Sequence, residues 1–150
     1  MIYLTGFLLL HLFSTAKAEP IFHEKHYPNG DEPFPVVIAL HTSGGYKTIR
    51  KSIKGFLAAG YAVYTPDFFE RHGIGYQNRF ETWTKYREQI EKELVEIVHV
   101  VKSDPKINPK NIFSVGYSNG GYWAAFLAAR NYVSAGVSHY GVWSWPGTHN

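Results

Sequence analysis

Short apolar segments alternate along this chain with stretches whose apolar residues recur every three or four positions. Residues 34–40 form a continuous apolar run between turn residues, which is typical of a strand buried on both faces of a parallel sheet. The predicted order is strand 34–40, helix 49–59, strand 61–65, helix 83–103, strand 111–115, helix 119–130 and strand 134–140. This order predicts an α/β domain with three layers, α/β/α, around a mostly parallel sheet. Residues 21–27 show a weaker strand pattern.

Composition excludes several classes of function. The chain has 150 residues, 45% of them hydrophobic and 18% charged, which indicates one globular domain. Its formal charge of +3 is small and evenly spread, so we expect no nucleic-acid partner. It has no cysteine, which excludes disulfides, zinc–thiolate sites and a thiol nucleophile. We expect neither a cofactor nor a bound metal.

The first eighteen residues have the pattern of a signal peptide. An apolar stretch over 2–13 is followed by Ala16-Lys17-Ala18 and then Glu19. The stretch is too short to span a bilayer, so we expect no stable membrane insertion. The sequence therefore predicts a signal peptide at 1–18 and a secreted or periplasmic domain at 19–150. An uncleaved anchor or buried segment is the alternative, because no Lys or Arg precedes the apolar stretch.

The segment Gly116-Tyr117-Ser118-Asn119-Gly120 joins a predicted strand directly to a predicted helix. A serine on such a sharp turn needs small residues two positions away on both sides. The turn lifts the hydroxyl above the sheet and leaves the Asn119 N–H at a helix N-terminus, where partial positive charge favours an oxyanion. The pattern predicts a nucleophile elbow, with Ser118 as the nucleophile and Asn119 as an oxyanion amide. An ordinary glycine-rich turn is the alternative.

A second loop, His41-Thr42-Ser43-Gly44-Gly45, follows another predicted strand. Parallel-sheet proteins build their sites at the carboxyl ends of strands. Such a loop can offer a second backbone N–H to the same oxyanion, and its two glycines allow a close approach. We therefore expect it to converge with the elbow, although a plain connector is the alternative.

Three segments together resemble the dienelactone hydrolase family of the α/β-hydrolase superfamily: 35–45, 61–69 with Arg71, and 108–121. The resemblance covers about 34–141 and implies hydrolysis of small esters or lactones. The family pattern has glycine where this chain has Thr42, and the analogy makes the Ser43 amide the second oxyanion donor. The family usually has cysteine at the elbow, so Ser118 favours ordinary carboxylester hydrolysis.

The rest of a catalytic triad is not evident in the sequence. In this fold the triad acid and histidine follow the serine, but no Asp or Glu follows Ser118. His139 lies in a predicted strand, where we expect it to be packed, and His149 is near the end. The resemblance makes Asp67 structural, and His41 is expected to brace the second loop.

These observations predict that 19–150 is part of an α/β-hydrolase domain, truncated at its C-terminus, with the triad Asp and His beyond Asn150. Such a part would have an open sheet edge and an uncovered apolar face. Arg71 and His72 lie on a loop that either contacts substrate or is solvated.

The predicted function is acyl transfer on carboxylic esters or lactones through Ser118, by a fragment that is inactive alone. Two alternatives remain open at this point. One is a serine peptidase of the prolyl-oligopeptidase type, which shares the elbow. The other is a non-catalytic binding protein with the same fold.

Overall fold

A computed structural model describes residues 19–144 and 146 of the chain. The predicted signal peptide, residues 1–18, and His149 lie outside the described residues. Within the described part, no helix is both long and apolar enough to cross a membrane.

The described residues form one five-stranded sheet and three α-helices. The strands lie in the order β1-β3-β2-β4-β5, and only β1 runs antiparallel to its neighbour. This architecture confirms the predicted α/β class and the mostly parallel sheet. The elements are β1 (His23–His26), β2 (Phe34–Leu40), α1 (Arg50–Ala58), β3 (Ala62–Pro66), α2 (Arg87–Ser103), β4 (Ile107–Tyr117), α3 (Asn119–Ala129) and β5 (Ala135–His139), with 3-10 helices η1 (Tyr46–Thr48), η2 (Glu70–His72) and η3 (Arg79–Thr82).

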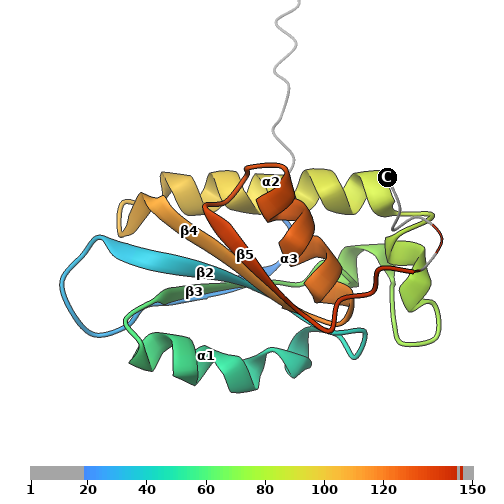
Figure 1. Ribbon diagram of the computed structural model, residues 1–150, viewed down its shortest axis with the longest axis horizontal. Helices are drawn as coiled ribbons and strands as arrows, with labels where there is room; N and C mark the ends of the chain where they lie inside the picture. The colour runs from blue at the N-terminus through green and yellow to red at the C-terminus, as the bar shows by residue number, and fades with distance from the viewer. Residues whose placement is uncertain (1–18, 145, 147–150) are drawn as a thin grey trace, which may run out of the picture.

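Helices cover both faces of the sheet, as the three-layer prediction requires. Figure 1 shows α2 and α3 on one face and α1 on the other. Strand β2 illustrates why: Val36 and Ile38 pack into the larger core with residues of α2 and α3, whereas Val37 packs with residues of α1. Alternate side chains of a strand point to opposite faces, so a strand that is apolar throughout needs cover on both sides.

Strands β2 and β4 end at the same level of the sheet. They pair in parallel, and Leu40 at the end of β2 lies opposite Gly116 near the end of β4. The loops that follow these two strands therefore leave the same edge side by side. This register brings together the two segments that the sequence singled out, although they are far apart along the chain.

The predicted helix over 83–103 begins later than expected. Helix α2 starts at Arg87, and the preceding residues form η3 and turns. Two contacts with α3 explain the difference: Trp123 Nε1 donates to Thr82 Oγ1 at 3.0 Å, and Asn119 Nδ2 donates to the Arg79 carbonyl at 3.2 Å. These bonds hold the segment against α3, and its apolar residues point into the core without belonging to the helix.

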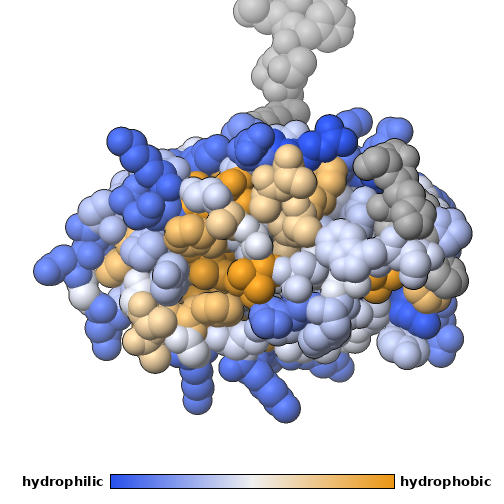
Figure 2. Space-filling model, in the orientation of Figure 1, coloured by the Kyte–Doolittle hydropathy of each residue, from blue (hydrophilic) through white to orange (hydrophobic). Residues whose placement is uncertain are grey.

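Strand β5 forms one edge of the sheet and leaves apolar surface bare. Val137 is 50% exposed, and Figure 2 shows apolar side chains gathered over β4 and β5. The expectation that His139 is packed was wrong: it is exposed, and its ring stacks on Tyr117 at 4.9 Å. The His139 side chain lies on the face of the sheet that α1 covers. Helix α1, however, packs against β2 and β3 and not against β5.

Candidate active site

Ser118 occupies the turn between β4 and α3 in an unusual backbone conformation. Its φ of 52° and ψ of −111° lie outside the regions that residues with side chains usually adopt. Such strain persists only where the surroundings enforce it, and it is concentrated at functional sites. The prediction of a sharp strand–turn–helix at this serine is therefore confirmed in its geometry.

Two glycines make this turn possible because neither has room for a side chain. A Cβ at Gly116 would lie 1.9 Å from the carbonyl oxygen of Gly120. A Cβ at Gly120 would lie 2.4 Å from the Leu40 carbonyl oxygen and 2.5 Å from that of His41. The obstacles are backbone atoms, which cannot rotate away as a side chain could. The spacing Gly-x-Ser-x-Gly is thus required sterically at both glycines.

Backbone hydrogen bonds hold Ser118 between strand β5 and helix α3. The Ser118 amide donates to the His139 carbonyl at 2.9 Å, and the Gly121 amide donates to the Ser118 carbonyl at 3.0 Å. The amide of Asn119, the first residue of α3, donates to no described residue. An unpaired N–H at a helix N-terminus is suited to hold a negative charge.

The loop after β2 is bonded directly to the elbow. The Gly120 amide donates to the His41 carbonyl at 3.0 Å, so the loop lies against the first turn of α3. This contact joins segments more than seventy residues apart, as the sequence analysis expected of the two loops. The close approach depends on Gly120, whose missing side chain leaves the space that the loop backbone fills.

Within this loop, the backbone amides of Thr42, Gly44 and Gly45 are hydrogen-bonded. The Thr42 amide donates to Thr48 Oγ1 at 3.1 Å, the Gly44 amide to Thr42 Oγ1 at 3.0 Å, and the Gly45 amide to the Thr42 carbonyl at 3.0 Å. The Ser43 amide has no acceptor among residues 19–144 and 146. Among the amides of residues 42–45, that of Ser43 is therefore the one available to a ligand.

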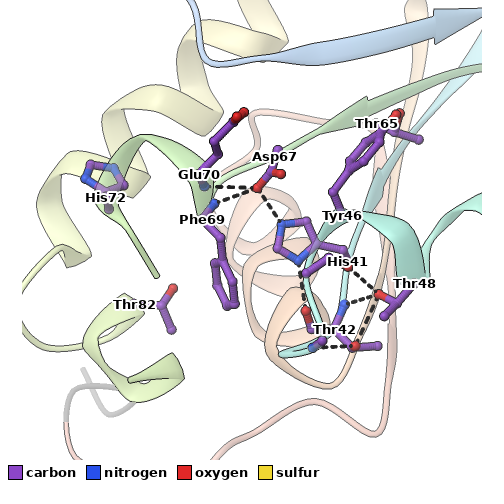
Figure 3. A network of polar contacts seen from close by, with 12 residues as sticks. His41, Thr42, Tyr46, Thr48, Thr65, Asp67, Phe69, Glu70, His72 and Thr82 are labelled. Atoms are coloured by element: carbon purple, nitrogen blue, oxygen red, sulfur yellow. Dashed lines mark hydrogen bonds and ion pairs between the residues drawn. The ribbon is translucent and has the colours of Figure 1, made fainter. Parts of the chain in front are cut away.

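His41 lies behind the loop, completely buried, between Asp67 and the Thr42 carbonyl (Figure 3). Its Nδ1 donates to the Thr42 carbonyl at 2.8 Å. Its Nε2 faces Asp67 Oδ1 at 3.4 Å, an ion-pair contact and not an aligned hydrogen bond. Because both ring nitrogens are engaged in this way, His41 does not serve Ser118 as a base in this arrangement.

Asp67 is held in its ionised form by the groups around it. Burial raises the pKa of its carboxyl, but the contact with His41 and the amides of Phe69 and Glu70 lower it by more. The net pKa lies below the ordinary value of 3.8. Both amides donate to the same oxygen, Oδ1, at 3.0 and 3.1 Å. Asp67 therefore acts as a fixed negative charge next to His41, which agrees with the structural role expected for it.

Arg71 and His72 are directed to helix α2. Arg71 Nη1 lies 3.3 Å from Glu93 Oε1, and His72 Nε2 lies 2.8 Å from Glu93 Oε2. Arg71 also donates through Nη2 to the carbonyls of Glu19 and Pro20. These contacts fasten the loop after β3 to α2 and to the start of the described chain, a role that neither sequence interpretation anticipated.

Thr48 is a residue of this site that the sequence analysis missed. Its hydroxyl donates to the Gly45 carbonyl at 2.8 Å and lies 3.2 Å from Thr42 Oγ1, besides accepting the Thr42 amide. A threonine soon after a glycine pair was the available signal, since hydroxyl side chains often bond to nearby loop backbone. As for metals, the described residues contain no group of three or more His, Asp or Glu side chains that could hold an ion.

The fold and the elbow define the class of this protein: an α/β domain of the α/β-hydrolase type, with a serine at the strand–turn–helix. More particularly, the chain belongs to the dienelactone hydrolase family, whose model matches residues 24–149. It is 29% identical over 122 residues to carboxymethylenebutenolidase of Pseudomonas putida, and the match covers 73% of this chain and 51% of that protein. The carboxymethylenebutenolidase of Pseudomonas knackmussii matches equally. The chain spans about half the length of these relatives.

Solved structures share the fold at low sequence identity. A dienelactone hydrolase-like promiscuous phosphotriesterase from metagenomic libraries matches with a TM-score of 0.65 and 16% identity, over 84% of this chain and 56% of that one. Acetyl xylan esterase 1 from Thermoanaerobacterium matches with a TM-score of 0.64 and 19% identity, over 81% of this chain and 44% of that one. At these identities the likeness establishes the fold alone.

Proposed function

We propose that this protein is a serine hydrolase that acts on small carboxylic esters or lactones through Ser118. The observation that carries the proposal is the strained Ser118 at the elbow, with two unpaired amides on the neighbouring turns, those of Asn119 and Ser43. Membership of the dienelactone hydrolase family supports the substrate class. The serine, where this family usually has cysteine, favours ordinary ester hydrolysis.

In the proposed reaction, the Ser118 hydroxyl oxygen attacks the ester carbonyl carbon while a histidine takes its proton. The carbonyl oxygen becomes an oxyanion, which the amides of Asn119 and Ser43 stabilise by hydrogen bonds. Collapse of this intermediate expels the alcohol, which receives the proton, and leaves an acyl group on Ser118. Water then hydrolyses the acyl-enzyme, with the same histidine acting as base.

The proposal places the triad acid and histidine in the part of the relatives that this chain does not cover. The relatives are about twice as long as the matched stretch, and in this fold both residues follow the serine in the chain. The described histidine after Ser118, His139, stacks on Tyr117 and is exposed. We therefore assign the base to residues beyond Asn150 in a complete protein.

A fluorophosphonate probe tests this assignment, because it reacts only with an activated serine. We expect rapid labelling of a full-length protein at Ser118, little labelling of residues 1–150 alone, and none after Ser118→Ala. Equal labelling of the 1–150 chain would mean that its own residues activate the serine. Absence of labelling in a full-length protein that hydrolyses no ester would instead favour a non-catalytic binding protein.

A further inference from the structure

The peptide group between Thr42 and Ser43 has two polar ends. Its carbonyl meets the buried ring of His41, and its N–H is the amide proposed to hold the oxyanion. This peptide bond is trans, because the cis bond among the described residues is that between Glu32 and Pro33. In a trans peptide, the carbonyl oxygen of one residue and the N–H of the next point in opposite directions. The group that holds the Thr42 carbonyl therefore decides where the Ser43 N–H points.

The Thr42 carbonyl is held by two donors, the Gly45 amide at 3.0 Å and His41 Nδ1 at 2.8 Å. The imidazole itself cannot turn easily. Its ring stacks on Phe68 with centroids 4.0 Å apart and planes 9° apart, and it meets Phe69 edge-on at 4.7 Å. A buried ring packed in this way presents its Nδ1 in a fixed direction, so the Thr42–Ser43 peptide plane is fixed as well.

Two polar groups face the two ring nitrogens of His41, the Thr42 carbonyl at Nδ1 and the Asp67 carboxylate at Nε2. A carbonyl oxygen can only accept, so the Nδ1 that meets Thr42 carries a hydrogen. The opposite nitrogen, Nε2, faces the Asp67 carboxylate, with 3.4 Å between Nε2 and Oδ1. Asp67 and the Thr42 carbonyl are the polar groups facing the ring, and Phe68 and Phe69 are its other ring contacts.

We propose that His41 is a positioning residue for the oxyanion site. Through Nδ1–H it holds the Thr42 carbonyl and so directs the Ser43 N–H away from the interior, toward the oxyanion that forms at Ser118. Asp67 fixes the ring by pairing with Nε2. This inference rests on the proposed function, since it assigns a purpose to the Ser43 amide, but it adds the His41–Asp67 pair, which touches no reacting atom.

Kinetics of the full-length protein with a small ester test the proposal. His41→Leu fills the space without a donor, and we expect kcat to fall about 10- to 100-fold with KM within about twofold, because an oxyanion donor acts mainly in the transition state. His41→Asn places an amide nitrogen near the former Nδ1, and we expect it to restore most of kcat. His99→Leu, at an exposed histidine of α2, is the matched control and leaves kcat unchanged.

These outcomes separate the inference from the proposed function. If Ser118→Ala remains active, the proposed function is wrong. If Ser118→Ala is inactive but His41→Leu keeps kcat within about twofold of wild type, the positioning role alone is wrong. Equal losses in His41→Leu and His41→Asn would also overturn it, because the ring volume and not the donor would then matter.

A spectroscopic measurement keeps the proposal testable if His41→Leu does not fold. Nitrogen NMR of histidine side chains, assigned with His41→Asn, reports whether each ring nitrogen carries hydrogen. We expect Nδ1 of His41 to carry the hydrogen that it donates to the Thr42 carbonyl. An Nδ1 without hydrogen in the wild-type protein would overturn the positioning role, because the ring could then not donate to the Thr42 carbonyl.

Discussion

The two loops that form the candidate site are held in place by opposite means. The elbow at Ser118 is shaped by missing side chains: Gly116 and Gly120 leave room for backbone atoms that pass within van der Waals contact. The loop after β2 is shaped by side chains that are present, above all His41 and Thr48, which bond its carbonyls and amides. One loop depends on space and the other on hydrogen bonds.

This difference predicts different responses to mutation. A Cβ that clashes with backbone atoms cannot be accommodated, because neither the Cβ nor the backbone can rotate away. A hydrogen-bonded loop loses its bonds one at a time, and water can replace those that are exposed. We therefore expect one substitution at an elbow glycine to cause a large loss of stability. Single substitutions in the loop after β2 should each cause a smaller loss.

The largest effect is expected for Gly116→Ala, whose Cβ would lie 1.9 Å from the Gly120 carbonyl oxygen. We expect a loss of at least about 4 kcal/mol in the free energy of unfolding, or no folded protein at all. The matched control is Gly55→Ala in α1, where nothing lies within 4 Å and alanine should stabilise the helix by about 1 kcal/mol. Urea unfolding measures both. Equal stability of the two variants would contradict a steric origin.

Asp67→Asn should have the next largest effect, about 3 kcal/mol at pH 7, because it replaces a carboxylate that accepts two backbone amides and faces buried His41. The folded pKa of Asp67 lies below its ordinary value, so its contribution is full above the unfolded pKa of about 4 and is lost as pH falls through the folded pKa. The difference in unfolding free energy between wild type and Asp67→Asn should therefore shrink below about pH 4. Exposed Asp31→Asn is the control, and a difference that grows on acidification would refute this sign.

Gly45→Ala should cost less, about 2 kcal/mol, because its requirement is conformational and not steric. Gly45 has φ of 80° and ψ of −175°, a region that residues with side chains rarely adopt, yet nothing lies within 4 Å of a Cβ there. Thermal unfolding of Gly45→Ala beside Gly116→Ala would sharpen the contrast between the loops. A cost as large as that of Gly116→Ala would show that the second loop is also limited by space.

The smallest effect is expected for Thr48→Val, about 1 kcal/mol, since the hydroxyl is exposed and water can replace its bonds. A double-mutant cycle with Thr42→Val measures how far the two hydroxyls depend on each other. We expect the effects to be non-additive, because the oxygens lie 3.2 Å apart in one network. Full additivity would mean that the loop does not depend on this pair.

Much of this fold could be read from the order of apolar segments. The run over residues 34–40 became β2, and the helix-like periodicities became α1, α2 and α3. The start of α2 could not be read, because apolar residues at helical spacing also suit a turn packed on another helix. The exposure of His139 depended on which strand ends the sheet, and local pattern carries no information about that.

The sequence by itself determined that Ser118 lies on a sharp strand-to-helix turn, because Gly116 and Gly120 lack the Cβ that such a turn excludes. The loop backbone that fills the space at Gly120 was decided by the tertiary structure. The sequence also determined that most of the strands would run parallel, since helical segments separate them. Only the tertiary structure decided that Ser43 keeps a free amide while Thr42, Gly44 and Gly45 do not. It likewise decided that His41 meets Asp67, which is contributed by the end of another strand. Such pairings arise when neighbouring strands end at the same edge of the sheet, and spacing along the chain does not encode them.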